Sequence, residues 1–159
     1  MKVVLFEPEI PQNTGNIART CAVTGSSLTL VKPLGFSLSK RQIKRAGLDY
    51  WDDVEVSTID ALEVNPHMLF FSTKGKKLYC DAPFSAESVL VFGSESRGLP
   101  QWVHDQHSEQ FYTIPMLKGQ RSLNLSNSVA IVLYEAYRRF DYAFPKKIKT
   151  SSLRTVKSA

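Results

Sequence analysis

Five short apolar segments, separated by stretches with helical spacing, constrain the fold of this 159-residue chain. The segments are rich in Val, Leu and Phe, and each is far shorter than the roughly 18 apolar residues of a membrane span. Strands that alternate with helices need crossover connections, which predicts an α/β fold with a mostly parallel sheet and helices on both faces. We expect strands at residues 2–6, 27–31, 67–71, 88–93 and 110–114.

The segments between these strands contain apolar residues at helical spacing. The longest helix is expected near the end of the chain, and the first begins within the segment 11–25, after the loop that follows the first strand. We predict helices at about residues 14–25, 39–47, 58–64, 101–106 and 124–140.

The last predicted helix has one main apolar stripe and two apolar residues outside it. Ile131 and Tyr134 fall off the stripe, so more than one face of this helix needs a covering surface. A second subunit would supply that surface, and we therefore expect a homodimer with Tyr134 at or near its interface. The main stripe consists of Leu125, Val129, Val132, Leu133, Ala136 and Phe140.

The net charge of +5 is concentrated at the end of the chain. Residues 145–159 contain five basic side chains and no acidic one, so residues 1–144 contain 15 basic and 15 acidic side chains. The body is therefore neutral. We expect one domain over residues 1–144 and a basic, flexible tail over residues 145–159.

One local basic cluster lies within the neutral body. Its four members recur at positions i, i+1, i+4 and i+5, so they share one face of the helix predicted at residues 39–47. A solvated helix face is one interpretation. The aromatic pair Tyr50 and Trp51 favours an RNA-binding surface, because bases stack on aromatic rings while phosphates bind Lys and Arg. The four residues are Lys40, Arg41, Lys44 and Arg45.

The cysteines and histidines do not form a metal-binding pattern. Cys21 and Cys80 are far apart in the sequence, and the three histidines complete no zinc motif. The chain begins directly with a predicted strand, which leaves no room for a signal peptide. We expect a cytoplasmic protein with two reduced thiols, no structural metal and no membrane segment.

Three loops that follow predicted strands have unusual compositions: residues 8–16, 93–100 and 115–127. In a parallel α/β sheet, the loops at the carboxyl ends of the strands form the site. None of the three is a dinucleotide-binding GxGxxG motif, a P-loop or a GxSxG nucleophile elbow. Taken singly, each is consistent with an ordinary turn.

Together, the three loops resemble the motifs of the SPOUT class of RNA methyltransferases. "NTGNIAR" at residues 13–19, "VFGSESRGLP" at 91–100 and the segment 114–136, which contains "RSLNLSN", match those motifs in order and spacing. "EPEIPQNTGNIAR" together with "RAGLDYW" resembles the TrmL-like subgroup, which 2′-O-methylates the wobble nucleotide of tRNA. The likeness covers roughly residues 1–144, with departures at Val23 and Ser94.

The resemblance implies a C-terminal trefoil knot, S-adenosylmethionine as methyl donor, and tRNA as substrate, with cytidine or uridine 34 as the target. It implies that the donor binds around Phe71, Gly93, Gly98, Ile114, Met116, Ser122 and Leu123. It implies a catalytic set of Asn13, Arg19, Glu95, Ser122 and Asn124.

The resemblance leaves the role of Arg19 open. A guanidinium has N–H donors but no acceptor, so Arg19 is a poor general base. It could instead stabilise the developing alkoxide or hold the adjacent phosphate. In a homodimer, Arg19 and the basic helix of one protomer could serve the donor site of the other.

Two alternative functions remain open at this point. One is 2′-O-methylation of a different tRNA or rRNA nucleotide. The other is a non-catalytic RNA-binding protein that uses the basic helix and the tail.

Overall fold

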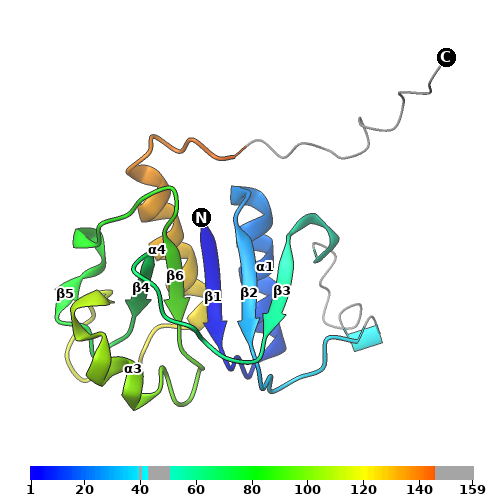
Figure 1. The fold of residues 1–159 in the computed structure, drawn as a ribbon, viewed down its shortest axis with the longest axis horizontal. Coiled ribbons are helices and arrows are strands. Elements are labelled where there is room, and N and C mark those ends of the chain that lie inside the picture. Colours follow the sequence, from blue (N-terminus) through cyan, green and yellow to red (C-terminus); the bar gives the residue numbers. More distant parts are fainter. Residues whose placement is uncertain (40, 43–50, 146–159) are drawn as a thin grey trace.

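The protein is described by a computed structural model, in which residues 1–39, 41–42 and 51–145 are placed. This part of the chain contains a seven-stranded sheet in the order β3-β2-β1-β6-β4-β7-β5 (Figure 1). Every pair of neighbouring strands is parallel. The strands are β1 (Lys2–Phe6), β2 (Ser27–Val31), β3 (Val56–Ile59), β4 (Met68–Phe71), β5 (Lys77–Leu78), β6 (Val89–Phe92) and β7 (Phe111–Thr113).

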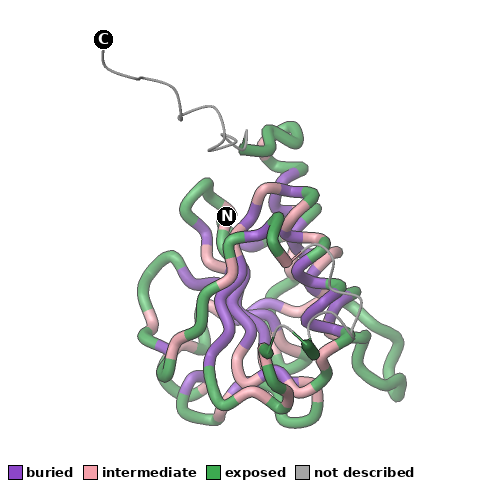
Figure 2. Tube along the Cα trace, turned by 90° about the vertical axis from the view of Figure 1, so that its right-hand side faces the viewer, coloured by how far each residue is buried: buried purple, intermediate pink, exposed green. Residues whose placement is uncertain are grey.

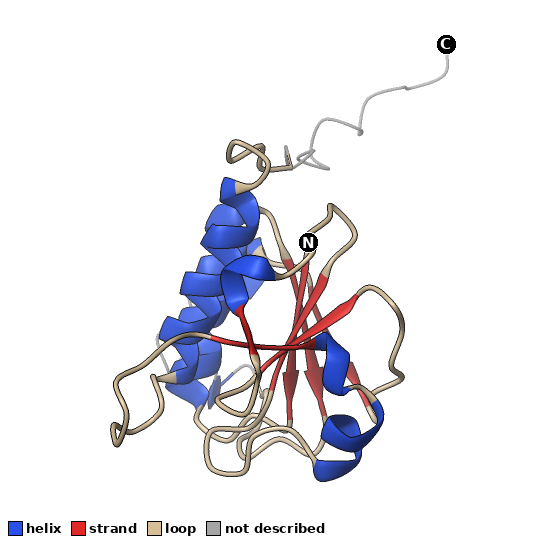
Figure 3. Ribbon diagram, turned by 90° about the vertical axis from the view of Figure 1, so that its left-hand side faces the viewer, coloured by secondary structure: helices blue, strands red, loops and turns tan. Residues whose placement is uncertain are grey.

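Helices cover both faces of the sheet, as the sequence predicts. The helices α1 (Pro11–Thr24) and α4 (Leu125–Arg138) contact each other and lie along one face (Figure 3). The short helix α3 (Gln101–Gln106) lies on the opposite side. Single turns of 3-10 helix complete this part of the chain: η1 (Trp51–Asp53), η2 (Tyr79–Asp81) and η3 (Ser108–Gln110).

The two faces of the sheet contribute to two separate apolar cores, because successive side chains of a strand point to opposite faces. Val3 and Leu5 pack in the core beneath α1 and α4, whereas Val4 packs with Val103 on the side of α3. Most residues of the central strands are buried, as the purple band along the tube shows (Figure 2). A parallel sheet covered on both faces explains why these strands are continuous apolar runs.

Helix α1 begins earlier than predicted, at Pro11 rather than residue 14. Proline suits the first helical position, because its fixed φ is helical and its missing N–H would have no partner there. The helix ends at Thr24, and the capping residue Gly25 follows with a left-handed φ of 68°. The N–H of Ser26 then donates to the carbonyl of Cys21. Because α1 begins at Pro11, its first turn lies directly beside the loop that follows β1.

Burial accounts for the state of the Cys21 thiol. Cys21 lies in the core between α1 and the sheet, and this burial raises its pKa to about 12. Cys21 and Cys80 are both free, as predicted. Because the reactive form of cysteine is the thiolate, Cys21 is an inert core residue.

Most predicted elements are confirmed, with one clear exception. The five predicted strands and the helices now called α1, α3 and α4 are present, with ends that shift by up to three residues. The predicted helix at 58–64 is wrong, because residues 56–59 form β3 and pair with β2. Most of the predicted helix at 39–47 lies outside the described residues, although Ser39 Oγ accepts from the Gln42 N–H at 3.4 Å. The trefoil knot, the single-domain boundary at residue 144 and the nature of the tail stay predictions.

The wrong helix has a simple physical cause. Strand β3 lies at an edge of the sheet, and its two end residues are partly buried while Ser57 and Thr58 are exposed. Val56 packs against the core on one face of the sheet and Ile59 against the core on the other. Its pairing with Leu28–Val31 holds residues 56–59 in an extended conformation, so a helix cannot begin at residue 58.

No helix in the described ranges is both long enough and apolar enough to cross a membrane.

We expect Leu90→Ala to lower the free energy of unfolding by about 2–5 kcal/mol, because it leaves a cavity in the core. Leu90 lies on the central strand β6 and is 0% exposed. The matched control is Leu78→Ala on the edge strand β5, where the side chain is 43% exposed and the loss should stay below about 1 kcal/mol. Denaturant unfolding measures both. Equal losses would contradict the assignment of β6 to the core.

Candidate active site

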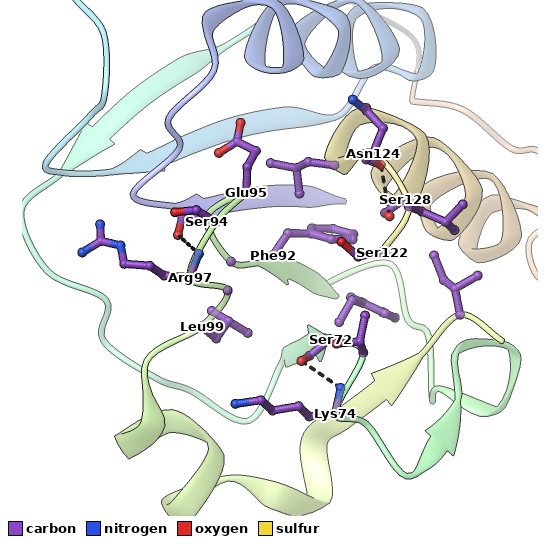
Figure 4. A pocket seen from close by; sticks show the side chains of 18 of the residues that line it. Ser72, Lys74, Phe92, Ser94, Glu95, Arg97, Leu99, Ser122, Asn124 and Ser128 are labelled. Carbon is purple, nitrogen blue, oxygen red and sulfur yellow. Dashed lines mark hydrogen bonds between the residues drawn. The ribbon is translucent and has the colours of Figure 1, made fainter. Parts of the chain in front are cut away.

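A cavity of about 430 Å³ lies where the loops after several neighbouring strands meet (Figure 4). Strands β1, β6, β4 and β7 are consecutive in the sheet, so the loops that follow them lie side by side at its carboxyl edge. All three loops singled out in the sequence contribute to the lining. The loop after β4, at residues 72–74, contributes as well.

The cavity brings together nearly all of the residues expected to bind the donor or to act in catalysis. Apolar side chains such as Phe71, Leu99 and Ile114 lie beside polar groups from the loops. Their functional roles stay predictions, because lining the cavity does not by itself identify the ligand. The expected residues that line the cavity are Asn13, Phe71, Gly93, Glu95, Gly98, Ile114, Met116, Ser122, Leu123 and Asn124.

A chain of side-chain hydrogen bonds links the three loops. The Nδ2 group of Asn13 donates to Oε1 of Glu95 at 3.1 Å, and Asn13 Oδ1 accepts from Nδ2 of Asn124 at 2.9 Å. Asn13 comes from the first turn of α1, Glu95 from the loop after β6 and Asn124 from the loop before α4. Asn13 is buried, so both of its hydrogen bonds form in a partly dehydrated setting, where an unpaired amide would be costly.

Asn124 also caps helix α4. Its Oδ1 accepts from the backbone N–H of Ser126 at 2.9 Å, from the Ser126 hydroxyl at 2.5 Å and from the Asn127 N–H at 3.4 Å. An N-cap asparagine satisfies N–H groups that have no partner within the helix. The same side chain therefore starts α4 and fixes its first turn against α1.

Two carboxylates join the loop after β1 to the loop after β6 in opposite directions. Glu95 accepts from the backbone N–H groups of Glu9 at 2.8 Å and Ile10 at 3.1 Å. Glu9 accepts in return from the Ser96 N–H at 3.0 Å and from the Ser96 hydroxyl at 2.6 Å. Hydrogen bonds to a charged acceptor are stronger than neutral ones, so this exchange holds the two loops together.

The loop after β6 is a tight hairpin that requires glycine at both ends. Ser94 and Gly98 form an isolated antiparallel bridge, with N–O distances of 3.2 and 2.9 Å. A Cβ atom on Gly93 would lie 2.1 Å from the carbonyl carbon of Gly98, an impossible contact. Gly98 has a left-handed φ of 67° but open space around its Cβ position.

Three cavity-lining residues with ionisable side chains were missed by the sequence analysis: Lys74, Arg97 and His104. Burial, and then the nearby Lys74, lower the pKa of His104 below its ordinary value, against an opposing effect of Asp105. The signal for Lys74 was present, since "STKG" directly follows β4 at the same sheet edge. Arg97 was quoted within a motif without a role, and His104 carries no sequence signal.

The structure does not bring every expected site residue to the cavity. Arg19 lies on the exposed side of α1, on the stripe shared by Gln12, Asn16 and Val23, and it does not line the cavity. Tyr134 is exposed on α4, which agrees with its position off the main apolar stripe. In the basic cluster, Arg41 is exposed, whereas Lys40, Lys44 and Arg45 lie outside the described residues.

Within the described ranges, no group of three or more His, Cys, Asp or Glu side chains could hold a metal ion. The cavity instead offers an apolar wall, bare backbone at two glycines and a set of fixed amides and carboxylates. Such a lining suits an organic ligand of moderate size, because pockets of roughly 300–1,000 Å³ with few polar anchors typically bind small molecules.

Comparison with known proteins gives a consistent family. Residues 1–134 match the profile of the SpoU rRNA Methylase family. A tRNA (cytidine(34)-2'-O)-methyltransferase of Methylovorus glucosotrophus is 47% identical over 148 residues, which cover 89% of this chain and 96% of the relative.

Solved structures share the fold. One from work on the 2-OH methylation of C/U34 on tRNA is 44% identical, with a TM-score of 0.79 over 88% of this chain and 95% of that one. The SpoU methyltransferase AviRb from Streptomyces viridochromogenes, in complex with AdoMet, is 19% identical. Its TM-score is 0.74 over 89% of this chain and 58% of that one, which is a likeness of fold.

We expect Gly93→Ala to cost more stability than Gly98→Ala. The added methyl group at residue 93 meets the backbone of Gly98 and Leu99, so the hairpin must open, at about 3 kcal/mol. The methyl group at residue 98 meets nothing within 4 Å, and only its left-handed backbone is strained, at about 1 kcal/mol. Denaturant unfolding of both variants measures the difference. A larger loss for Gly98→Ala would refute the close approach at Gly93.

Proposed function

Because this chain belongs to the SpoU rRNA methylase family, we propose that it is a tRNA methyltransferase that modifies the ribose 2′-hydroxyl of the wobble nucleotide, cytidine or uridine 34. The observation that carries this proposal is the 47% identity to a tRNA (cytidine(34)-2'-O)-methyltransferase over almost the whole of both chains. We further propose that the enzyme works in the cytoplasm as a homodimer.

The methyl donor is S-adenosylmethionine, and the cavity fits it. Its volume of about 430 Å³ lies within the range for such ligands, and neither Gly93 nor Gly98 places a side chain between the backbone and the cavity. The apolar wall of Phe71, Ile114 and Met116 would hold the adenosine part. When bound, the donor supplies a methyl group on a positively charged sulfur, which a hydroxyl oxygen can accept directly.

The chain itself then has to position the hydroxyl and stabilise the charge on its oxygen. The linked side chains of Asn13, Glu95 and Asn124 hold the loops around the reacting groups at fixed distances. We assign Arg19 to the substrate side, where its guanidinium would stabilise the oxygen as the proton leaves or bind the adjacent phosphate.

The position of Arg19 supports a site shared between two protomers. Arg19 lies outside the cavity of its own chain, on the exposed side of α1. The neighbouring helix α4 exposes Ile131 and Tyr134, at 38% and 43%, and α1 exposes Val23 at 61%. Apolar side chains on two adjacent helices are suited to a partner surface. We propose that Tyr134 lies at this interface and that Arg19 of one protomer serves the cavity of the other.

We propose that RNA also contacts the basic cluster of Lys40, Arg41, Lys44 and Arg45. In the described part of that cluster, Arg41 is exposed. An anticodon stem-loop is wide compared with one 17.9 kDa chain, so a surface that extends over two protomers suits it.

The function is tested by methylation of two tRNA transcripts with labelled S-adenosylmethionine. One transcript contains cytidine 34, and the matched control contains 2′-deoxycytidine at that position. We expect label on the first and none on the second, because the deoxy sugar lacks the acceptor oxygen. Label on both transcripts would contradict position 34 as the target, and label on neither would contradict the activity.

Arg19→Ala should abolish methyl transfer and leave the affinity for S-adenosylmethionine within a few-fold of wild type, because Arg19 does not line the donor cavity of its own chain. A matched control is Lys77→Ala, which removes an exposed cation that lies on the edge strand β5, away from α1 and α4, and does not line the cavity.

Mixing the Arg19→Ala chain with a Gly93→Val chain tests the shared site. Each parent should be inactive, while the mixed dimer should regain about one working site. Inactivity after verified subunit exchange would refute the shared site, and a monomer in sedimentation would refute the dimer.

A further inference from the structure

Arg97 lies at the mouth of the cavity with two carboxylates on one side. Its Nη2 donates to Oε2 of Glu7 at 3.0 Å, and its Nε lies 3.8 Å from Oε1 of Glu9. The second contact is an ion pair that is too long for a hydrogen bond. The Arg97 side chain is 68% exposed although the residue lines the cavity, so the guanidinium is accessible from solvent.

The backbone of Glu7 is held in an unfavourable conformation beside this ion pair. Its φ of 47° is left-handed, which costs a residue other than glycine about 1–3 kcal/mol. The Glu7 N–H donates to the carbonyl of Val31 at 3.0 Å, and the carboxylate reaches Arg97. The ion pair between Arg97 and Glu7 has an exposed partner, so it stabilises the fold by only about 0–1 kcal/mol, which is generally less than the cost of the Glu7 backbone conformation. The ion pair alone therefore does not offset this strain, and what the Glu7 carboxylate does is hold the Arg97 guanidinium at the mouth of the cavity.

We propose that Arg97 is a binding site for a backbone phosphate of the substrate RNA, next to the nucleotide whose ribose enters the cavity. This inference rests on the proposed function. A guanidinium binds phosphate through two parallel N–H groups, and Arg97 uses one terminal nitrogen for Glu7. The weaker contact with Glu9 is the one that a phosphate replaces. Glu9 keeps its hydrogen bonds to the N–H and hydroxyl of Ser96 when this happens.

Lys74 adds a second cation to the same side of the cavity. It comes from the loop after β4, the strand next to β6 in the sheet, and the side chains of Lys74 and Arg97 both extend toward the left of Figure 4. An RNA strand that crosses the mouth would meet both cations. The carboxylates of Glu7 and Glu9 hold the guanidinium in place before RNA arrives and offset its charge.

The test is the salt dependence of tRNA binding for the wild type, Arg97→Gln, Arg97→Lys and Glu7→Gln. Arg97→Gln should weaken binding by about tenfold and lower the slope of log K against log salt by about 0.7, the value for one phosphate contact on a single strand. Arg97→Lys should restore the slope but only part of the affinity, because lysine lacks the paired donors. Glu7→Gln should tighten binding, because it removes the competing charge and keeps the side-chain size.

Lys77→Gln is the matched control. The Lys77 side chain is 45% exposed and is paired with Glu109 at 2.9 Å, but it lies on the edge strand β5 and does not line the cavity. It should leave the tRNA affinity and the slope unchanged. Calorimetry with S-adenosylmethionine and thermal unfolding accompany each variant, and both should stay at wild-type values for Arg97→Gln.

Three results would overturn the proposal. An unchanged salt slope for Arg97→Gln, together with a lower melting temperature, would show that Arg97 only holds the loops after β1 and β6 together. A loss of donor affinity with unchanged tRNA binding would assign its guanidinium to the carboxylate of the donor. Weaker tRNA binding for Glu7→Gln would show that the two carboxylates assist RNA binding instead of competing with it. If the wild-type protein binds S-adenosylmethionine but no tRNA, the proposed function fails before Arg97 is tested.

Discussion

The carboxylate of Glu95 is the group on which the geometry of the cavity depends most. It accepts from two backbone N–H groups at the entrance of α1 and from the side chain of Asn13. A carboxylate beside the N-terminus of a helix is also favoured by the helix dipole. Asn13 in turn accepts from Asn124, so the Glu95 carboxylate helps to fix the spacing of three loops whose linked residues are up to 111 positions apart in the sequence.

The sequence predicts the framework of this site well, for reasons that the structure makes plain. A parallel sheet covered on both faces needs uninterrupted apolar strands, and such strands are easy to recognise. The rule that sites form at the carboxyl ends of strands then selects the loops that contain Asn13, Glu95 and Asn124. Physical reasoning reaches this point unaided, while the donor and the RNA target come from the family resemblance.

The remaining features depend on contacts that no local pattern encodes. Strand β3 exists because β2 offers it an edge to pair with, and the sequence around residue 58 alone favours a helix. The reciprocal hydrogen bonds of Glu9 and Glu95 join two loops that are 86 residues apart, and no local sequence pattern indicates which groups each carboxylate binds. Tyr137 lies beside the predicted apolar stripe, yet it is buried in the core, where its hydroxyl is satisfied by a hydrogen bond with Ser26 Oγ at 3.0 Å.

The distribution of charge follows from the need to bring a polyanion to this cavity. Residues 1–144 have no net charge, so long-range attraction from the body is weak, and RNA must be recognised by local groups. Glu95 lines the cavity, and Glu7 and Glu9 lie beside its mouth next to Arg97, where bare carboxylates would repel phosphates. Each is bonded instead to backbone amides or to Arg97. The acidic groups therefore act as acceptors that shape the loops, while Lys74 and Arg97 face the solvent side of the cavity and can meet the RNA.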